Sequence, residues 1–418
     1  MNRISYSLLL LLLTPLILLY LGYRATKSID YRGRIGERFS FGLPKLDQPI
    51  IIHCASMGET LAALPLIQRL QQQYPTSPLL VTTTTPTGSA QVKQHLGTSV
   101  YHCYLPLDFS WATRRFVAKL KPKAVILMET ELWPNLVHHC SRANVPVIVA
   151  NARLSERSAA SYQKLTKVVT PMLQQLTAVA VQHADDGNRF VDLGLAANKI
   201  TECGSLKFDI HIDATARQQG LDAAEQLGNR PKWIAASTHP GEFEQALAAH
   251  QQLLSQYPDL LLIIVPRHPE QFDHAAALAQ KAEFKIQRRS ETLVVDNSTQ
   301  VLIGDTMGEL KTLYGASDIA FVGGSMIERG GHNPLEPAAF GKPVLMGPHY
   351  YNFQQIGDAL KAQGVMSTVD TVEALQLQVD DLIQCKTARE GIAALALEFV
   401  AQNSGATDRQ LEVIQAAI

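Results

Sequence analysis

Short apolar runs rich in β-branched residues alternate with longer amphipathic stretches along almost the whole chain. This alternation constrains the fold more than any other feature, because repeated strand–helix–strand units form parallel sheets with helices on both faces. We therefore predict an α/β protein. Strands are expected at residues 50–54, 79–84, 100–104, 124–128, 147–150, 178–181 and 200–203 in the first half, and at 233–236, 260–265, 284–287, 300–303, 319–322, 344–346 and 365–368 in the second.

One open sheet with so many strands would be unusual, so two Rossmann-like domains fit better. A chain of 418 residues is long enough for two domains with full cores. Residues 209–230 are polar and show a helical pattern without a strand, which predicts a linker. The predicted organisation is a membrane anchor at 1–24, a first domain at 25–208, a linker at 209–230 and a second domain at 231–418.

Residues 4–23 carry no charge and are rich in leucine, which is about the ~20 residues that cross a bilayer. Pro15 is tolerable in a membrane helix. A cleaved secretory signal is the alternative, but no small-x-small cleavage site follows the apolar run. Only Arg3 precedes this run, whereas basic residues follow it, so the rest of the chain is predicted on the cytoplasmic side of the membrane. The basic residues that follow are Arg24, Lys27, Arg32, Arg34 and Arg38.

Composition narrows the class of protein further. Hydrophobic residues make up 46% of the chain and charged residues 18%, as in globular proteins. The net charge of −1 gives no support for a nucleic-acid partner. The five cysteines are widely spaced and show no CxxC or metal-ligand pattern. They are therefore predicted to be reduced, mostly buried thiols of a cytoplasmic domain.

Three charged residues in the first half follow predicted strands, where ligands of parallel sheets bind. Glu59 opens a helix after the first strand and is placed to act as a general base; the alternative is a structural role in the first turn of that helix. Glu129 directly follows the fourth strand, where a carboxylate is costly to bury without a partner, so a cap or a structural ion pair is equally plausible. Lys207 follows the seventh strand and could reach a phosphate or carboxylate, although a single lysine near a linker is more often a solvated side chain.

Several segments of the second half have the character of a phosphate site. Pro266 and Arg267 follow the most hydrophobic strand, and arginine suits a bidentate contact with phosphate. Residues 305–309 are predicted to begin a helix, with the N–H groups of Met307, Gly308 and Glu309 open to an anion. Thr238 to Glu242 repeat this arrangement. Each segment also has an ordinary structural interpretation.

The loop before residue 336 is the richest of these segments. It follows an apolar run that ends at Gly323-Gly324 and contains Arg329, Gly330, Gly331 and His332. A helix is predicted to start at Pro334, with its free N–H groups directed at the loop. Glu336 would then accept hydrogen bonds from ribose hydroxyls. The residues of this predicted nucleotide site are Asn333, Pro334, Leu335 and Glu336.

Familiar cofactor and metal motifs are missing from the sequence. It contains no GxGxxG after the first strand, no GxxxxGK[ST], no HExxH and no Asp-x-Asp pair. No cofactor and no metal ion are therefore expected. An enzyme that uses an activated sugar would have to neutralise the leaving phosphate with helix ends and with Arg or Lys.

Nine motifs in one order resemble the family of Kdo (3-deoxy-D-manno-octulosonic acid) transferases of Gram-negative bacteria. The resemblance covers essentially the whole chain. The motifs are Gly36-Glu37-Arg38-Phe39, SMGET at 56–60, TTTTPTGS at 82–89, METELWPN at 128–135, NARLSERS at 151–158, GSLKFD at 204–209, VPRHPE at 265–270, GDTMGELK at 304–311 and FVGGSMIERGGHNPLE at 321–336.

The resemblance implies a monotopic or single-pass enzyme of the inner membrane with a GT-B fold, in which two Rossmann-like domains face each other across a cleft. It implies transfer of Kdo from the donor CMP-Kdo to lipid IVA, the lipid A precursor, with inversion and without a metal. Matched by motif, Glu59 would be the general base, and Glu129 and Lys207 would support the transition state. The CMP contacts would be Pro266, Arg267, Met307, Gly308, Glu309 and Asn333 to Glu336.

Two alternatives stay open from the sequence. One is another membrane-associated GT-B transferase, or an epimerase, that uses a UDP-sugar. The other is a non-catalytic, membrane-tethered nucleotide-binding module. Arg32, Arg34 and Arg38 are candidate contacts for the phosphates of the acceptor. The acceptor-contact residues, the number of Kdo units transferred and the oligomeric state are not encoded in a motif.

Overall fold

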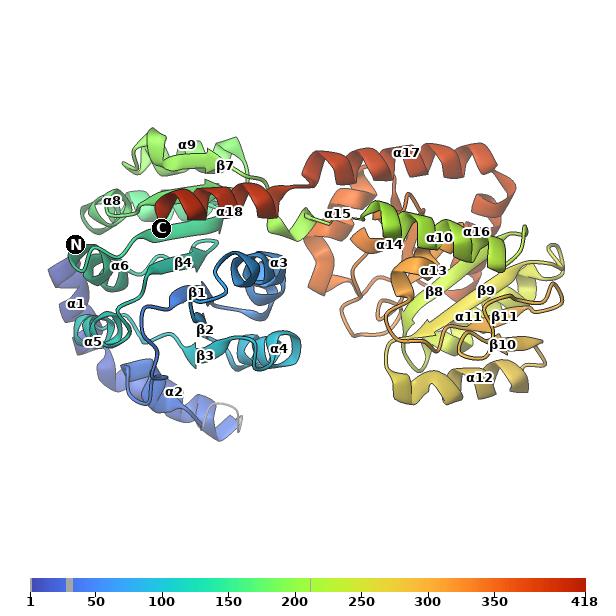
Figure 1. The fold of residues 1–418 in the computed structure, drawn as a ribbon, viewed down its shortest axis with the longest axis horizontal. Coiled ribbons are helices and arrows are strands. Elements are labelled where there is room, and N and C mark those ends of the chain that lie inside the picture. Colours follow the sequence, from blue (N-terminus) through green and yellow to red (C-terminus); the bar gives the residue numbers. More distant parts are fainter. Residues whose placement is uncertain (1, 28–32, 211) are drawn as a thin grey trace. The chain divides into compact units, whose positions relative to one another are not determined.

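A computed structural model describes residues 2–27, 33–210 and 212–418. The chain divides into two units that we describe separately (Figure 1): Met1–Lys207 with Gly405–Ile418 form the first, and Phe208–Ser404 form the second. Each unit contains one seven-stranded sheet, and every strand pair in both sheets is parallel. The prediction of two parallel α/β domains is confirmed.

The sheet of the first unit has the strand order β3-β2-β1-β4-β5-β6-β7. Its chain order therefore reverses direction between β1 and β4, and such a switch point is where open α/β sheets bind ligands. The strands are β1 (Ile50–Cys54), β2 (Leu79–Thr83), β3 (Tyr101–Tyr104), β4 (Ala124–Met128), β5 (Val147–Ala152), β6 (Ala178–Val181) and β7 (Ile200–Glu202).

Alternating side chains of these strands fill two cores, one on each face of the sheet. In β1, Ile50 and Ile52 enter one core, while Ile51 enters the other. The first core is covered by α3 (Met57–Gln73), α4 (Pro86–Leu96) and α18 (Ala406–Ala417). The second is covered by α5 (Ser110–Leu120), α6 (Pro134–Arg142), α7 (Glu156–Gln163), α8 (Thr166–Gln174) and α9 (Ala184–Asp192).

The sheet of the second unit has the order β10-β11-β9-β8-β12-β13-β14, with its switch point between β8 and β12. The strands are β8 (Lys232–Thr238), β9 (Leu261–Pro266), β10 (Ile286–Arg288), β11 (Val301–Ile303), β12 (Ile319–Val322), β13 (Val344–Met346) and β14 (Met366–Thr368). The helices are α10 (Ala214–Gln226), α11 (Glu242–Leu253), α12 (Phe272–Lys281), α13 (Leu310–Ala316), α14 (Leu335–Ala339), α15 (Gln354–Ala362), α16 (Val372–Gln384) and α17 (Lys386–Asn403).

Both units also contain short 3₁₀ turns. These turns are η2 (Ile35–Phe39), η3 (Ala197–Lys199), η4 (Leu206–Phe208), η5 (Pro269–Gln271) and η6 (Tyr351–Phe353).

The two structural units differ from the predicted boundaries in two places. The predicted linker at 209–230 contains α10, which packs against α13 within the second unit. The crossing is tight, because a Cβ on Gly220 would lie only 2.8 Å from the Cα of Gly315. At the other end, Gly405–Ile418 belong to the first unit, where Ala406 and Ile414 are fully buried in its core.

The apolar N-terminal segment forms two helices, α1 (Arg3–Leu12) and α2 (Thr14–Lys27), where one was predicted. The break lies beside Pro15, whose ring cannot follow a preceding helical turn. No single helix in the described ranges is long and apolar enough to span a bilayer, whereas this pair, bent by 55°, meets the requirement in length and composition when taken together. Leu12 and Leu19 are exposed, while Arg3 and Ser7 bind the amide oxygen of Asn135 at 3.0 Å.

The cysteines agree with the expectation of free, mostly buried thiols. Cys54, Cys103, Cys140 and Cys203 are buried and Cys385 is exposed, and all five are free.

Candidate active site

Glu59 lies at the switch point of the first sheet, in the first turn of α3 directly after β1. Ser56 is the N-cap of this helix, and its side-chain oxygen accepts the N–H of Glu59. The N–H of Ala55 donates to Oε2 of Glu59 at 2.8 Å, and the hydroxyl of Ser56 donates to Oε1 at 2.8 Å. Both carboxylate oxygens are therefore held in place.

Glu59 is also largely shielded from solvent, because the residue is only 9% exposed. Burial raises its pKa above the usual value, and the charges of Glu131 and Glu129 raise it further, while the hydrogen bonds from Ser56 and Ala55 oppose the rise. A carboxylate with a raised pKa takes up a proton more readily near neutral pH, as a general base must. The same hydrogen bonds to Ala55 and Ser56 also give Glu59 a structural role at the start of α3, which is the alternative that the sequence left open.

Glu129 and Lys207 lie together in the first unit. Their side chains form an ion pair with Nζ and Oε1 2.8 Å apart, and about a fifth of each side chain is exposed. Glu129 directly follows β4 with a φ of 54°, a left-handed backbone conformation that is strained for glutamate. Its N–H donates to the carbonyl of Ala150 at 2.9 Å, which fixes this conformation. The ion pair that the sequence left open is present.

The segment that carries Lys207 is held by buried amides from distant parts of the chain. The N–H of Leu206 donates to the side-chain oxygen of Asn151 at 3.0 Å. Gln410, fully buried on α18, accepts the N–H of Asn151 at 2.7 Å and donates to the carbonyl of Gly204 at 3.1 Å. The C-terminal helix thus fixes the turn before Lys207, a role that the sequence pattern did not indicate.

Another acid of the first unit, Glu131, lies near Glu59 and contacts the buried His53. Oε2 of Glu131 is 3.7 Å from Nε2 of His53, and the other ring nitrogen of His53 lies 3.1 Å from the hydroxyl of Thr82. His53 is fully buried within β1. A histidine in an otherwise apolar strand was the available signal for this contact.

In the second unit, two histidines meet at the switch point between β8 and β12. His239 follows β8, and His332 follows the loop after β12. Their Nε2 atoms are 3.0 Å apart, and the rings stack with centroids 5.3 Å apart. Burial is the largest cause that lowers the pKa of each to about 4, and the nearby Arg267 and Arg329 lower both further. The pair is therefore neutral at neutral pH in the free protein.

Buried Glu242, at the start of α11, shapes the loop that leads to His332. Its carboxylate accepts the N–H groups of His239, Gly324, Ser325 and Met326 at 2.7–3.1 Å. Four hydrogen bonds of this kind satisfy a buried charge. The backbone of this loop is thus fixed before any ligand arrives.

Arg267 lies beyond the end of β9, as predicted, and its N–H donates to the carbonyl of Thr238 at 2.9 Å. The side chain is exposed. Among the described residues, its guanidinium has no hydrogen-bond partner or ion-pair partner. It therefore remains open to an anion.

The segment at 305–309 differs from its prediction. The helix α13 begins at Leu310, with Glu309 as its N-cap and Gly308 in a left-handed conformation. The carboxylate of Glu309 accepts from the hydroxyl of Thr306 and pairs with the buried Arg289 at 3.3 Å. Met307 is 72% exposed. Met307, Gly308 and Glu309 therefore precede the helix, whereas the sequence predicted that they form its first turn.

The segment at 333–336 also differs in detail. The helix α14 begins at Leu335, not at Pro334, and Pro334 is its N-cap. The side-chain oxygen of Asn333 accepts the N–H of Leu335 at 3.1 Å, so this N–H is already satisfied. Burial raises the pKa of Glu336, while Lys311 and Arg267 oppose that rise. The structure thus brings Glu336 near Arg267, but only part of the expected set of free N–H groups remains.

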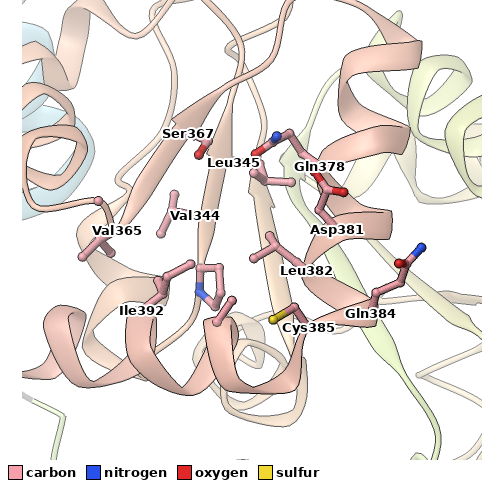
Figure 2. Close-up of a pocket in the computed structure, with 13 residues that line it drawn as sticks. Val344, Leu345, Val365, Ser367, Gln378, Asp381, Leu382, Gln384, Cys385 and Ile392 are labelled. Atoms are coloured by element: carbon pink, nitrogen blue, oxygen red, sulfur yellow. The ribbon is translucent and has the colours of Figure 1, made fainter.

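A hollow of about 400 Å³ in the second unit is lined by residues other than the predicted site residues (Figure 2). It is lined by Val344, the first residue of β13, by Val365, just before β14, and by Cys385. It therefore lies toward the amino ends of these strands, whereas the predicted site residues follow the carboxyl ends of theirs. None of the predicted site residues lines it.

Within residues 2–27, 33–210 and 212–418, no group of three or more His, Cys, Asp or Glu is arranged to hold a metal ion. The absence of a metal from the reaction stays a prediction.

Comparison with protein families gives two matches. Residues 33–210 match the model of 3-deoxy-D-manno-octulosonic-acid transferase (kdotransferase), and residues 239–396 match that of glycosyl transferases group 1. A 3-deoxy-D-manno-octulosonic acid transferase of Haemophilus influenzae is 44% identical, over 99% of this chain and 98% of the relative. One of Bordetella pertussis is 35% identical, over 99% of both chains.

Solved structures give further similarities. MurG of Acinetobacter baumannii is 14% identical with a TM-score of 0.52, over 88% of this chain and 99% of that chain, which shows a shared fold. The C-terminal CMP-Kdo binding domain of WaaA from Acinetobacter baumannii is 36% identical, with a TM-score of 0.42, over 45% of this chain and 99% of that chain.

Proposed function

Because the chain belongs to the family of 3-deoxy-D-manno-octulosonic acid (Kdo) transferases, we propose that it transfers Kdo from CMP-Kdo to lipid IVA, with inversion and without a metal ion. As a Kdo transferase it is a glycosyltransferase, and its two parallel α/β units give it the GT-B fold. One observation carries the detailed proposal. The acids of the family motifs collect after β1 and β4, and Lys207 binds one of them.

In the proposed step, Glu59 accepts the proton of the attacking acceptor hydroxyl. The hydroxyl oxygen forms a bond to the anomeric carbon of Kdo, while the bond from that carbon to the phosphate oxygen breaks and its electron pair leaves with CMP. A single displacement of this kind inverts the anomeric centre. The fixed orientation of the Glu59 carboxylate and its raised pKa support the role of base.

Lys207 and Glu129 are proposed to support the transition state. Lysine supplies a positive charge where negative charge develops, and it does so most effectively when its position is set in advance. The ion pair with Glu129 and the hydrogen bonds of the preceding turn hold it in this way.

The second unit is proposed to bind the donor through Pro266, Arg267, Met307, Gly308, Glu309, Asn333, Pro334, Leu335 and Glu336. The exposed guanidinium of Arg267 suits the phosphate of CMP. The carboxylate of Glu336 suits hydroxyl groups of the ribose. Since the side chain of Glu309 is engaged with Arg289, its backbone is the part proposed to contact CMP.

We also propose that α1 and α2 hold the protein at the inner membrane, with the catalytic units on the cytoplasmic side and lipid IVA within reach. The exposed leucines of the bent pair support this placement. Arg34 and Arg38 are weaker candidates for acceptor phosphates than the sequence suggested. Arg34 is paired with Glu37 at 2.8 Å, and Arg38 is buried and donates to the carbonyl of Thr84 at 2.8 Å. Arg32 lies outside the described residues.

The test is a transfer assay with CMP-Kdo and lipid IVA on detergent-solubilised protein. We expect Glu59→Gln to lower kcat by roughly 100- to 10,000-fold, the usual contribution of general base catalysis. Glu244→Gln is the matched control, because Glu244 is also the third residue of its helix, α11, and also accepts a backbone N–H from just before that helix. It should retain nearly full activity.

Three outcomes would contradict parts of this proposal. Turnover of UDP-sugars without turnover of CMP-Kdo would favour the alternative transferase or epimerase. Unimpaired transfer by Glu59→Gln would remove Glu59 as the base. Full biological activity of Glu59→Ala, together with loss of activity when the loop before His332 is disrupted, would favour a non-catalytic nucleotide-binding module.

A further inference from the structure

The cationic cluster around His239 and His332 is more strongly charged than one phosphate requires. Two arginines, Arg267 and Arg329, both lie close enough to lower the pKa of each histidine. The third histidine of the cluster, His268, has its ring 5.6 Å from that of His239. The cluster therefore has two permanent positive charges close to a pair of imidazoles whose Nε2 atoms are 3.0 Å apart.

The nearby acids do not neutralise this cluster. The carboxylate of Glu242 is buried and already accepts four backbone N–H groups. Glu336 interacts with Lys311 and, less strongly, with Arg267, and among the described residues no ion pair joins it to Arg267 or Arg329. The like charges of Arg267 and Arg329 repel each other, so an anion bound between them would stabilise the arrangement.

The charge of the ligand follows from this count. The phosphate that joins CMP to a sugar is a diester and carries one negative charge, which one arginine can neutralise. A second arginine beside an imidazole pair calls for a second anionic group on the same ligand. The sugar of the proposed donor is an acid, and its carboxylate is bonded to the same carbon as the phosphate oxygen.

We propose that His239, His332 and Arg329 form a subsite for the carboxylate of the sugar acid, next to the phosphate contact of Arg267. This inference rests on the proposed function and adds a basis for its specificity. A neutral sugar on a nucleotide would leave Arg329 and the imidazole pair without a partner, and an unpaired site of this kind rejects the wrong ligand strongly.

The loop geometry supports a subsite that is formed in advance. The N–H of Gly331 donates to the carbonyl of Gly324 at 2.7 Å, and the N–H of His332 donates to that of Gly323 at 3.1 Å, which closes the loop. The side chain of Asn352 donates to the carbonyl of Arg329 at 3.0 Å. Gly331 has a φ of 73°, and an added Cβ would lie 3.2 Å from the Cα of Tyr350, so glycine is favoured there. Little ordering of the loop backbone is left to occur on binding.

The experiment compares two ligands that differ by the sugar acid, CMP and CMP-Kdo, by equilibrium binding without acceptor. We expect Arg329→Gln and His332→Asn to weaken binding of CMP-Kdo by roughly 10- to 100-fold and to leave binding of CMP nearly unchanged. Arg267→Gln should weaken both ligands. Arg329 is exposed, so its variant keeps the test valid even if His332→Asn fails to fold. His274→Asn, an exposed histidine on α12, is the control and should change neither affinity.

The outcomes separate the inference from the proposed function. An equal loss of affinity for CMP and CMP-Kdo in Arg329→Gln would assign the cluster to the phosphate and overturn the carboxylate subsite. Unchanged affinity for both ligands would overturn it as well. If the wild-type protein itself does not bind CMP-Kdo, the proposed function fails first, and this inference fails with it.

Discussion

The two units share one scaffold and differ in the charge at its switch point. Each has a seven-stranded parallel sheet, and in each the residues beyond the strand ends are polar and partly buried. The first unit collects acids there, with one lysine, whereas the second collects histidines and arginines. An acidic group suits removal of a proton, and a basic group suits binding of an anionic nucleotide. We therefore propose that one architecture supports two tasks, each set by only a few side chains.

After Glu59, the largest loss of activity that would sharpen this comparison is expected at Lys207. Lys207→Met removes the positive charge of the first unit and leaves Glu129 without its partner. We expect kcat to fall by about 100- to 1000-fold, as when a preorganised group that stabilises a transition state is lost. The measurement is the rate of transfer at saturating donor.

Two further variants serve as controls for that prediction. Lys207→Arg keeps the charge and should recover part of the activity, and Lys164→Met changes an exposed lysine of the same unit and should have no effect. Activity of Lys207→Met close to that of wild type would show that the ion pair is structural only.

A smaller effect, on stability, is expected at Gln410. Gln410→Leu leaves the N–H of Asn151 and the carbonyl of Gly204 buried without their partner. Each unsatisfied group costs about 1–3 kcal/mol, so the free energy of unfolding of the first unit should fall by roughly 2–6 kcal/mol. Denaturant unfolding measures this. Gln402→Leu, at an exposed position of α17, is the control. An equal change in the free energy of unfolding in both variants would contradict the role of Gln410.

The smallest effect concerns the pH dependence of the first unit. Glu59 must be deprotonated to act as a base, so kcat/KM should fall as the pH drops through its raised pKa. Because the charge of Glu131 contributes to that rise, Glu131→Gln should lower the pKa and move the acidic limb to lower pH. Glu156→Gln, with an exposed carboxylate, should leave the limb in place. A limb that moves to higher pH in Glu131→Gln would contradict this assignment.

The sheets could be predicted from the sequence because buried parallel strands are continuous apolar runs. β1, β4, β6, β12 and β13 have the predicted bounds. Helix starts were less predictable. Glu309 and Pro334 resemble first helical residues, but both are N-caps in the structure. A sequence pattern places a helix start only to within about one or two residues. The single apolar span became two helices beside Pro15.

A site residue could be predicted from the sequence where it comes directly after a predicted strand. Glu59, Glu129 and Arg267 could be placed in this way. The contact between His239 and His332 could not, since 93 residues separate them and only the strand order brings them together. Gln410 is still farther from Asn151, at 259 residues, and no local pattern marks a glutamine as a buried bridge.

The central claim is that the acidic group performs the proton transfer and the basic group binds the donor. Its most direct test is to measure kcat and CMP affinity together in Glu59→Gln and Arg267→Gln. The account predicts that Glu59→Gln loses kcat by roughly 100-fold or more with unchanged CMP affinity. Arg267→Gln should instead lose CMP affinity by roughly 10-fold or more. Loss of CMP affinity in Glu59→Gln, or full kcat in that variant, would contradict the division of tasks.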